Sequence, residues 1–281
     1  VYIHGGQRLD LMCASADMYC IKDDKISFIH QDNTMPKPRF GHSIIGIGKG
    51  QFLMHGGVNT DLYDSRFYVA NYFRHTTSDN KFYVYSCEKN TWLQLTIVAP
   101  MSRAFHTCNA VDNKYFFIGG ISSTTNTIPN ERIPLYEIMC LVILDLESQD
   151  YYIQIVKLKE SPTSNTYLSN HATVVFHDMF VIFGGISQCK AALDKSDINV
   201  QGTDKMYIVD VKKKSVQMVH SQYMQSDLLT QGHTMHVIDK DCIMIFGGSM
   251  KGIVMYSSKI MSPTPCDMID KCIIAEFDVI S

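Results

Sequence analysis

The sequence lacks several patterns that would assign it to a well-defined class of protein. No apolar run approaches the roughly 18 residues that a membrane-spanning helix needs. There is no N-x-[ST] acceptor site and no C-x-x-C pair, and the nine cysteines show no zinc-finger spacing with histidine. These absences favour a cytoplasmic or nuclear protein with reduced thiols over a secreted, disulfide-bonded one.

Motifs of several enzyme classes are also absent. The chain has no G-x-S-x-G, no H-E-x-x-H and no P-loop. Its 25 Lys and Arg against 28 Asp and Glu give a net charge of −3, which argues against a broad basic surface for duplex phosphates. We therefore expect a protein without catalytic activity, metal or cofactor. Direct binding of nucleic acid is disfavoured, although a local basic patch is left open.

Gly-Gly pairs recur along the chain, each directly after a short run of apolar or aromatic residues. Their first glycines lie at positions 5, 56, 119, 184 and 247, so successive steps are 51, 63, 65 and 63 residues. Repeats of this length are typical of repeat architectures, and the Val, Ile, Tyr and Phe in them favour strands. Because glycine has no Cβ and accepts positive φ, we expect each pair to close a strand where the backbone turns close to a neighbour.

A histidine lies 13 or 14 residues before four of these pairs and opens another short apolar stretch. The four phased histidines are His42, His106, His171 and His233. Arg39 and Arg103 each precede one of them by three residues, a place that Leu168 and Thr230 take in the other two repeats. The Gly-Gly pairs and the histidines thus repeat in phase.

A third mark follows each Gly-Gly pair after a variable gap. An apolar strand ends in a polar hinge, and a large apolar residue comes seven positions after the strand's last apolar one, as in Tyr85 and Trp92. The corresponding pairs are Ile21 and Phe28, Leu144 and Tyr151, and Val209 and Val216. Each repeat therefore contains four short strands, and no window of roughly 10–18 residues shows a helical stripe.

These marks together resemble kelch-repeat β-propellers. The signature of that family is a diglycine that closes the second strand, followed by a Tyr and a Trp spaced as Tyr85 and Trp92 are here. The resemblance covers nearly the whole chain, although Phe28, Tyr151 and Val216 stand in place of Trp in the other repeats. It implies an all-β fold, a kelch-type β-propeller in which the Tyr and Trp fill the space between adjacent blades.

The register of the repeats indicates five recognisable four-stranded blades of a ring that would have six. Their approximate borders are 1–38, 39–101, 102–168, 169–230 and 231–281. On this register the sequence starts at the second strand of the first blade and stops after the third strand of the fifth. We therefore expect a propeller that is truncated at both ends.

The resemblance implies a non-enzymatic protein–protein interaction module, which binds a peptide or domain through the loops at one face of the propeller. Such domains often recruit substrates to cullin-type ubiquitin ligases, so a cullin or adaptor complex is one expected partner. Two alternatives remain open. One is an accessory or scaffolding subunit of a nucleic-acid-processing or chromatin assembly, similar to the kelch-like accessory subunit of the immune-receptor gene recombinase. The other is a structural or cytoskeletal subunit.

Arginines and histidines at the repeated positions are the first candidates for partner contact. In a propeller the loop before the innermost strand surrounds one mouth of the channel, where Arg39 and Arg103 would clamp a carboxylate or an acidic peptide. The alternative is that each arginine only supports its own loop. Arg66 and Arg132, in the long loops, carry the same partner hypothesis. The phased histidines are expected to line the mouth or support the loops: His42, His106, His171 and His233.

Overall fold

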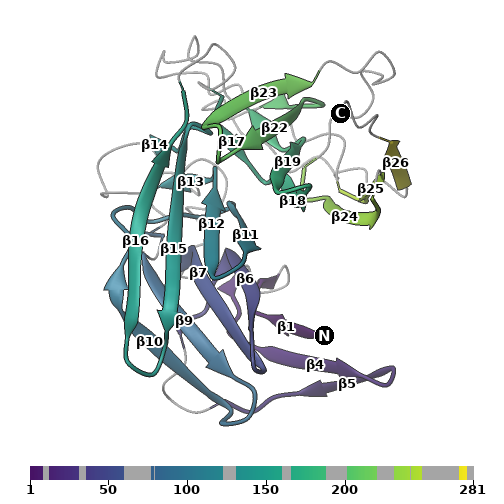
Figure 1. Ribbon diagram of the computed structural model, residues 1–281. Helices are drawn as coiled ribbons and strands as arrows, with labels where there is room; N and C mark the ends of the chain where they lie inside the picture. The colour runs from purple at the N-terminus through teal and green to yellow at the C-terminus, as the bar shows by residue number, and fades with distance from the viewer. Residues whose placement is uncertain are drawn as a thin grey trace, which may run out of the picture. The chain divides into compact units, whose positions relative to one another are not determined.

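The computed structural model describes only part of the chain. The described residues are 1–8, 13–31, 36–59, 77–78, 80–122, 131–159, 166–187, 201–219, 231–240, 242–248 and 272–276. Within these ranges every regular element is a β-strand (Figure 1), so the predicted all-β fold is confirmed. No helix capable of crossing a membrane occurs in them.

The chain divides into two compact units, which are described separately. The first comprises Val1–Phe105, Ile121–Glu131 and Ile143–Tyr152. The second comprises His106–Gly120, Arg132–Val142 and Ile153–Ser281.

Two antiparallel sheets of three or more strands belong to the first unit. The first sheet has the order β1-β4-β5, with β1 Tyr2–His4, β4 Met18–Lys22 and β5 Lys25–Phe28. The second has the order β10-β9-β7-β6, with β6 Phe40–Gly48, β7 Gln51–Asn59, β9 Lys81–Ser86 and β10 Thr91–Val98. In both sheets one strand pairs with the strand before the hinge: it is β1, which ends directly before its Gly-Gly pair, or β7, which contains its own.

Three further sheets repeat this order. The third sheet is β11-β12-β15-β16, with β11 Thr107–Val111, β12 Lys114–Ile118, β15 Glu137–Asp145 and β16 Asp150–Lys157. The fourth is β18-β19-β22-β23, with β18 Ala172–Phe176, β19 Met179–Phe183, β22 Met206–Asp210 and β23 Ser215–Val219. The fifth is β24-β25-β26, with β24 Thr234–Asp239, β25 Cys242–Phe246 and β26 Cys272–Glu276. The expected borders between repeats stay predictions.

A short ladder follows four of the Gly-Gly pairs. Each ladder joins the residues directly after the glycines to a second short strand farther along the chain, and so brings the two ends of a connection together. The ladders are β2 (Gln7–Arg8) with β3 (Cys13–Ala14), the end of β7 with β8 (Thr77–Ser78), β13 (Ile121–Ser122) with β14 (Glu131–Arg132), and β20 (Ile186–Ser187) with β21 (Gln201–Gly202). A further short strand, β17 (Leu168–Ser169), pairs with β20.

The seven-residue spacing around the hinge reflects cross-strand pairing. Tyr85 lies opposite Trp92 in the β9–β10 hairpin, and Val209 lies opposite Val216 in the β22–β23 hairpin. The first sheet differs because its hinge is a tighter turn, in which Asp23 and Asp24 both adopt positive φ. Its register accordingly pairs Ile21 with Ile26 and Tyr19 with Phe28.

The Tyr and Trp of the second sheet fill the space against the first sheet, as the sequence predicted. Tyr2 and Met18 from the first sheet form one apolar cluster with Met54, Tyr85 and Trp92. Trp92 is also fixed by a hydrogen bond of 2.6 Å from its Nε1 to the side-chain oxygen of Gln31. Burial of such large rings is the main source of stability between stacked sheets.

Two more apolar clusters lie within the second unit. One includes Phe116, Ile182 and Val216 of the third and fourth sheets, and the other includes Phe183 and Ile245 of the fourth and fifth. Phe116 and Phe180 pack ring against ring with centroids 5.1 Å apart. Sheet-on-sheet packing of one kind therefore repeats within each unit.

Backbone hydrogen bonds join the glycine end of one sheet to the start of the next at three places, which we call the glycine seams. The N–H of Gly6 donates to the carbonyl of Arg39 at 2.9 Å. In the same way Gly57 donates to Arg103 at 2.8 Å, and Gly120 donates to Leu168 at 2.7 Å. Each acceptor is the residue three positions before a phased histidine.

The first glycine of a pair is required at a seam for a steric reason as well. Gly119 has φ +63°, and a Cβ there would lie 2.6 Å from the carbonyl oxygen of Leu168 and 2.7 Å from Cε1 of His171. Gly5 has φ +68°, and its Cβ would lie 2.7 Å from the carbonyl oxygen of Arg39. Any residue with a Cβ at these positions would clash with the backbone that leads into the next sheet.

We predict that Gly119→Ala destabilises the protein more than its positive φ alone explains. The matched control is Gly232→Ala, since Gly232 has a similar φ of +67° but no atom within 4 Å of the added Cβ. The control should lose about 1–2 kcal/mol from left-handed strain, and Gly119→Ala should lose about 1–3 kcal/mol more from overpacking. Urea unfolding of both variants measures the difference. Equal losses would show that the seam tolerates a side chain.

Candidate functional site

Arg39 lies in the interior, with an exposed fraction of 0%. Its Nη1 donates to the carbonyl of Gly56 at 2.9 Å, and its Nε donates to the carbonyl of Lys37 at 3.0 Å. The guanidinium carbon also stands 5.0 Å from the centroid of the Tyr83 ring, a cation–π distance. The side chain thus holds its own loop against the Gly-Gly end of the second sheet.

Arg103 occupies the equivalent place in the next repeat and is also buried, with 1% of its surface exposed. Its carbonyl accepts the seam hydrogen bond from Gly57. The burial of both arginines supports the alternative in which they stabilise their loops. Partner contact by Arg39 and Arg103 stays a prediction, to which their burial gives no support.

The phased histidines are also withdrawn from the surface. His106, His171 and His233 are buried, and His42 is half-buried. A strand begins one residue after His106, His171 and His233, as the sequence predicted, whereas β6 begins two residues before His42. These side chains therefore mark the entry into the innermost strand.

Each of three phased histidines rests on the end of the preceding sheet. Nε2 of His42 is 3.4 Å from Nδ1 of His4, the residue before Gly5. The ring of His233 packs edge-on against Phe183, the residue before Gly184, with centroids 5.4 Å apart. The ring of His171 lies beside Gly119, where a Cβ on the glycine would clash with it. Its Nε2 is 3.2 Å from the hydroxyl of Thr107.

Burial keeps three of the phased histidines, together with His4, neutral at physiological pH. Desolvation lowers the pKa of His171 from its ordinary value of 6.5 to about 3, helped by the charge of His233. It also lowers the pKa of His42 to about 3, and the pKa values of His4 and His233 to about 4. A neutral, buried imidazole offers no positive charge to a partner, so these residues are best explained as packing groups.

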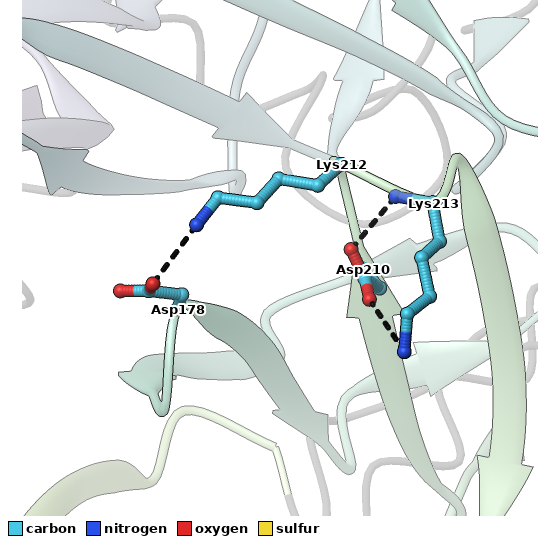
Figure 2. A network of polar contacts seen from close by, with 4 residues as sticks. All are labelled: Asp178, Asp210, Lys212 and Lys213. Carbon is cyan, nitrogen blue, oxygen red and sulfur yellow. Dashed lines mark hydrogen bonds and ion pairs between the residues drawn. The ribbon is translucent and has the colours of Figure 1, made fainter.

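Exposed charge gathers instead at the hinge between β22 and β23. Lys212 forms an ion pair of 2.9 Å with Asp178, and Lys213 lies 3.6 Å from Asp210 (Figure 2). The N–H of Lys213 also donates to Asp210 at 2.9 Å, which closes the hinge. Such solvated pairs contribute little to stability, and this hinge is an ordinary polar turn.

The remaining candidates give less information. Arg66 lies outside the described residues. The backbone of Arg132 belongs to β14, but its side chain is not among those described. In the described part of the chain, no group of three His, Cys, Asp or Glu side chains is placed to hold a metal ion.

Comparison with known protein families shows to which family the chain belongs. A family model described as the KLHDC2/KLHL20/DRC7 Kelch-repeats domain matches residues 1–248. The chain belongs to the kelch-repeat family. Its Gly-Gly sheets are therefore kelch blades, and the kelch-type β-propeller expected from the sequence is confirmed. Kelch domains are in general protein-interaction modules, and this kelch chain is one of them.

One curated protein is similar in sequence to part of the kelch chain. The Rho GTPase-activating protein gacHH of Dictyostelium discoideum is 28% identical over 114 residues. The match takes in 39% of this chain and only 7% of that protein. The activity in the name of gacHH is therefore not carried over to this kelch chain.

We predict that acid destabilises the protein through the buried histidines of the kelch seams. Unfolded histidine takes up a proton below pH 6.5, whereas folded His171 stays neutral down to about pH 3. Stability is thus complete above pH 6.5 and falls as the pH drops from there towards 3. Between pH 7 and pH 5, His171→Gln should lose about 1–2 kcal/mol less unfolding free energy than the wild type does.

Urea unfolding at several pH values measures this slope. His236→Gln is the matched control, because it replaces an exposed histidine in the neighbouring strand β24. It should keep the wild-type fall in stability. A wild-type slope in His171→Gln would mean that His171 is not neutral in the folded protein.

Proposed function

We propose that this kelch domain binds a protein partner through the connections that follow its Gly-Gly pairs. The supporting observation is the short ladder at the base of these connections. In β20 and β21, Ile186 lies opposite Gly202 and Ser187 lies opposite Gln201. Two-residue ladders of the same kind pair the residues that flank the connections 9–12 and 60–76.

A closed base matters for binding because it fixes both ends of a connection before a partner arrives. A connection whose ends already meet has part of its closure entropy removed, and so it loses less freedom on binding. The residues that repeat, by contrast, make contacts within the fold. Arg39 and three of the phased histidines are buried, so the connections, which differ from one repeat to the next, are the parts left for recognition.

The finer role that we propose is recruitment of a substrate to a cullin-type ubiquitin ligase in the cytoplasm or nucleus. This role rests on the family resemblance, and it needs an adaptor-binding segment in the full-length protein. No disulfide joins the cysteine side chains that the structure describes, which supports a reducing compartment. No catalytic group is assigned to this domain.

Replacing one connection at a time tests the proposal. Residues 188–200 are exchanged for a Gly-Ser segment of equal length, with β20 and β21 kept, and residues 60–76 are treated likewise. We expect at least one replacement to melt like the wild type and to lose at least about tenfold in the capture of a partner, which corresponds to 1.4 kcal/mol. Capture uses the tagged full-length protein and mass spectrometry.

The matched control is Lys212→Ala with Lys213→Ala, which changes exposed residues of a hinge and not of a connection. It should capture the same partners as the wild type. If the hinge variant lost them while both replacements kept them, the binding surface would lie elsewhere. Cullin or adaptor subunits among the partners would support the ligase role, and stoichiometric partners without them would contradict it.

A further inference from the structure

His4 and His42 face each other across the boundary between the first and second sheets. His4 is the last residue of β1 and His42 belongs to β6, and Nδ1 of His4 is 3.4 Å from Nε2 of His42. The two rings lie edge to face, with centroids 5.3 Å apart. His4 is buried and also packs edge-on against Trp92, with centroids 5.1 Å apart. The two imidazoles are therefore part of the contact between the sheets.

The surroundings of the pair are tightly packed. A Cβ on Gly5 would lie 2.8 Å from Cε1 of His42, so the His42 ring rests directly on the backbone next to His4. The other ring nitrogen of His4, Nε2, is buried and has no hydrogen-bond partner in the described part of the chain. A proton added at that nitrogen would thus meet no acceptor among those residues.

Protonation would turn this contact into a repulsive one. A neutral imidazole has one N–H, so neutral His4 and His42 can face each other as one donor and one acceptor. When both rings are protonated, every ring nitrogen carries an N–H, and two donors of like charge stand 3.4 Å apart. The doubly protonated pair is therefore stable only if the rings move apart.

Charged side chains from neighbouring segments act on the pair in both directions. Burial lowers the pKa of His4 and His42, and the charge of Arg39 lowers both further. The carboxylate of Asp17 raises the pKa of His4. Arg39 directly precedes β6, and Asp17 directly precedes β4. The neutral rings are thus favoured while the sheets are packed together.

Only one face of the first sheet is packed in the part of the chain that the structure describes. On that face Tyr2 and Met18 contact the second sheet. On the opposite face Ile3, Ile26 and Phe28 are 48%, 70% and 48% exposed. Because few buried apolar contacts hold this sheet, it should open locally at a lower free energy than the sheets that are packed on both faces.

We propose that His4 and His42 form a pH-sensitive switch, which keeps the first sheet packed on the second while both rings are neutral and releases it when both are protonated. In the released sheet the histidines take up protons below their ordinary pKa of 6.5, whereas in the packed sheet they stay neutral down to about pH 4. Release therefore takes up two protons, and the ratio of released to packed sheet rises about 100-fold per pH unit. The packing is strongest above pH 6.5 and weakens as the pH falls from there towards 4.

The test follows backbone hydrogen exchange of the whole chain by mass spectrometry, from about pH 7 down to about pH 4, with rates corrected for chemical exchange. We expect the protection factors of β4 to fall about 100-fold per pH unit in this range. Strand β22 of the fourth sheet should stay better protected than β4 at every pH. Equal protection of β4 and β22 would mean that the first sheet does not open by itself, and would overturn the proposal.

Variants test whether the pair is the source of the pH dependence. His42→Gln and His4→Gln each remove one titrating ring, so the fall in β4 should become about tenfold per pH unit. His30→Gln is the matched control, because it changes an exposed histidine of the same unit and should keep the wild-type dependence. Protection of β22 at about pH 7 shows that each variant is folded. A wild-type dependence in both His42→Gln and His4→Gln would contradict the switch.

Discussion

One backbone hydrogen bond, from the second glycine of a Gly-Gly pair to the start of the next sheet, organises this structure. It recurs at Gly6, Gly57 and Gly120 with lengths of 2.7–2.9 Å. For this bond to form, the preceding glycine must have no Cβ, because the next sheet's carbonyl and histidine occupy that space at Gly119. The glycine pair and the histidine are therefore two halves of one contact, which is why they keep the same phase along the sequence.

Most of the fold could be predicted because these contacts leave a regular trace in the sequence. The Gly-Gly pairs located the second strands, and the spacing of Tyr85 and Trp92 located a hairpin that the structure pairs directly. The first sheet departs from this spacing because Asp23 and Asp24 form a tighter turn, which no repeated mark signals. The short ladders were also missed, because pairs such as Gln7–Arg8 and Gln201–Gly202 carry no strand pattern.

The candidate site was harder to predict, since a repeated polar residue has two physical explanations. Arginine at a loop before the innermost strand is equally suited to an anionic partner and to the carbonyls of its own backbone. The structure shows the second use for Arg39, with Gly56 and Lys37 as acceptors. Only burial distinguishes the two, and burial of a polar side chain depends on the sheets packed around it. We therefore propose that a partner is recognised by the parts of the chain that do not repeat.

The repeated polar residues hold the fold together, and a substitution of Arg39 is the sharpest test of this role. The measurement is the unfolding free energy of Arg39→Leu beside that of Lys37→Ala, which removes an exposed side chain but keeps the carbonyl that accepts from Arg39. We expect a loss of about 2–4 kcal/mol for Arg39→Leu and a change within about 0.5 kcal/mol for Lys37→Ala. Wild-type stability in Arg39→Leu, together with a lost partner, would contradict it.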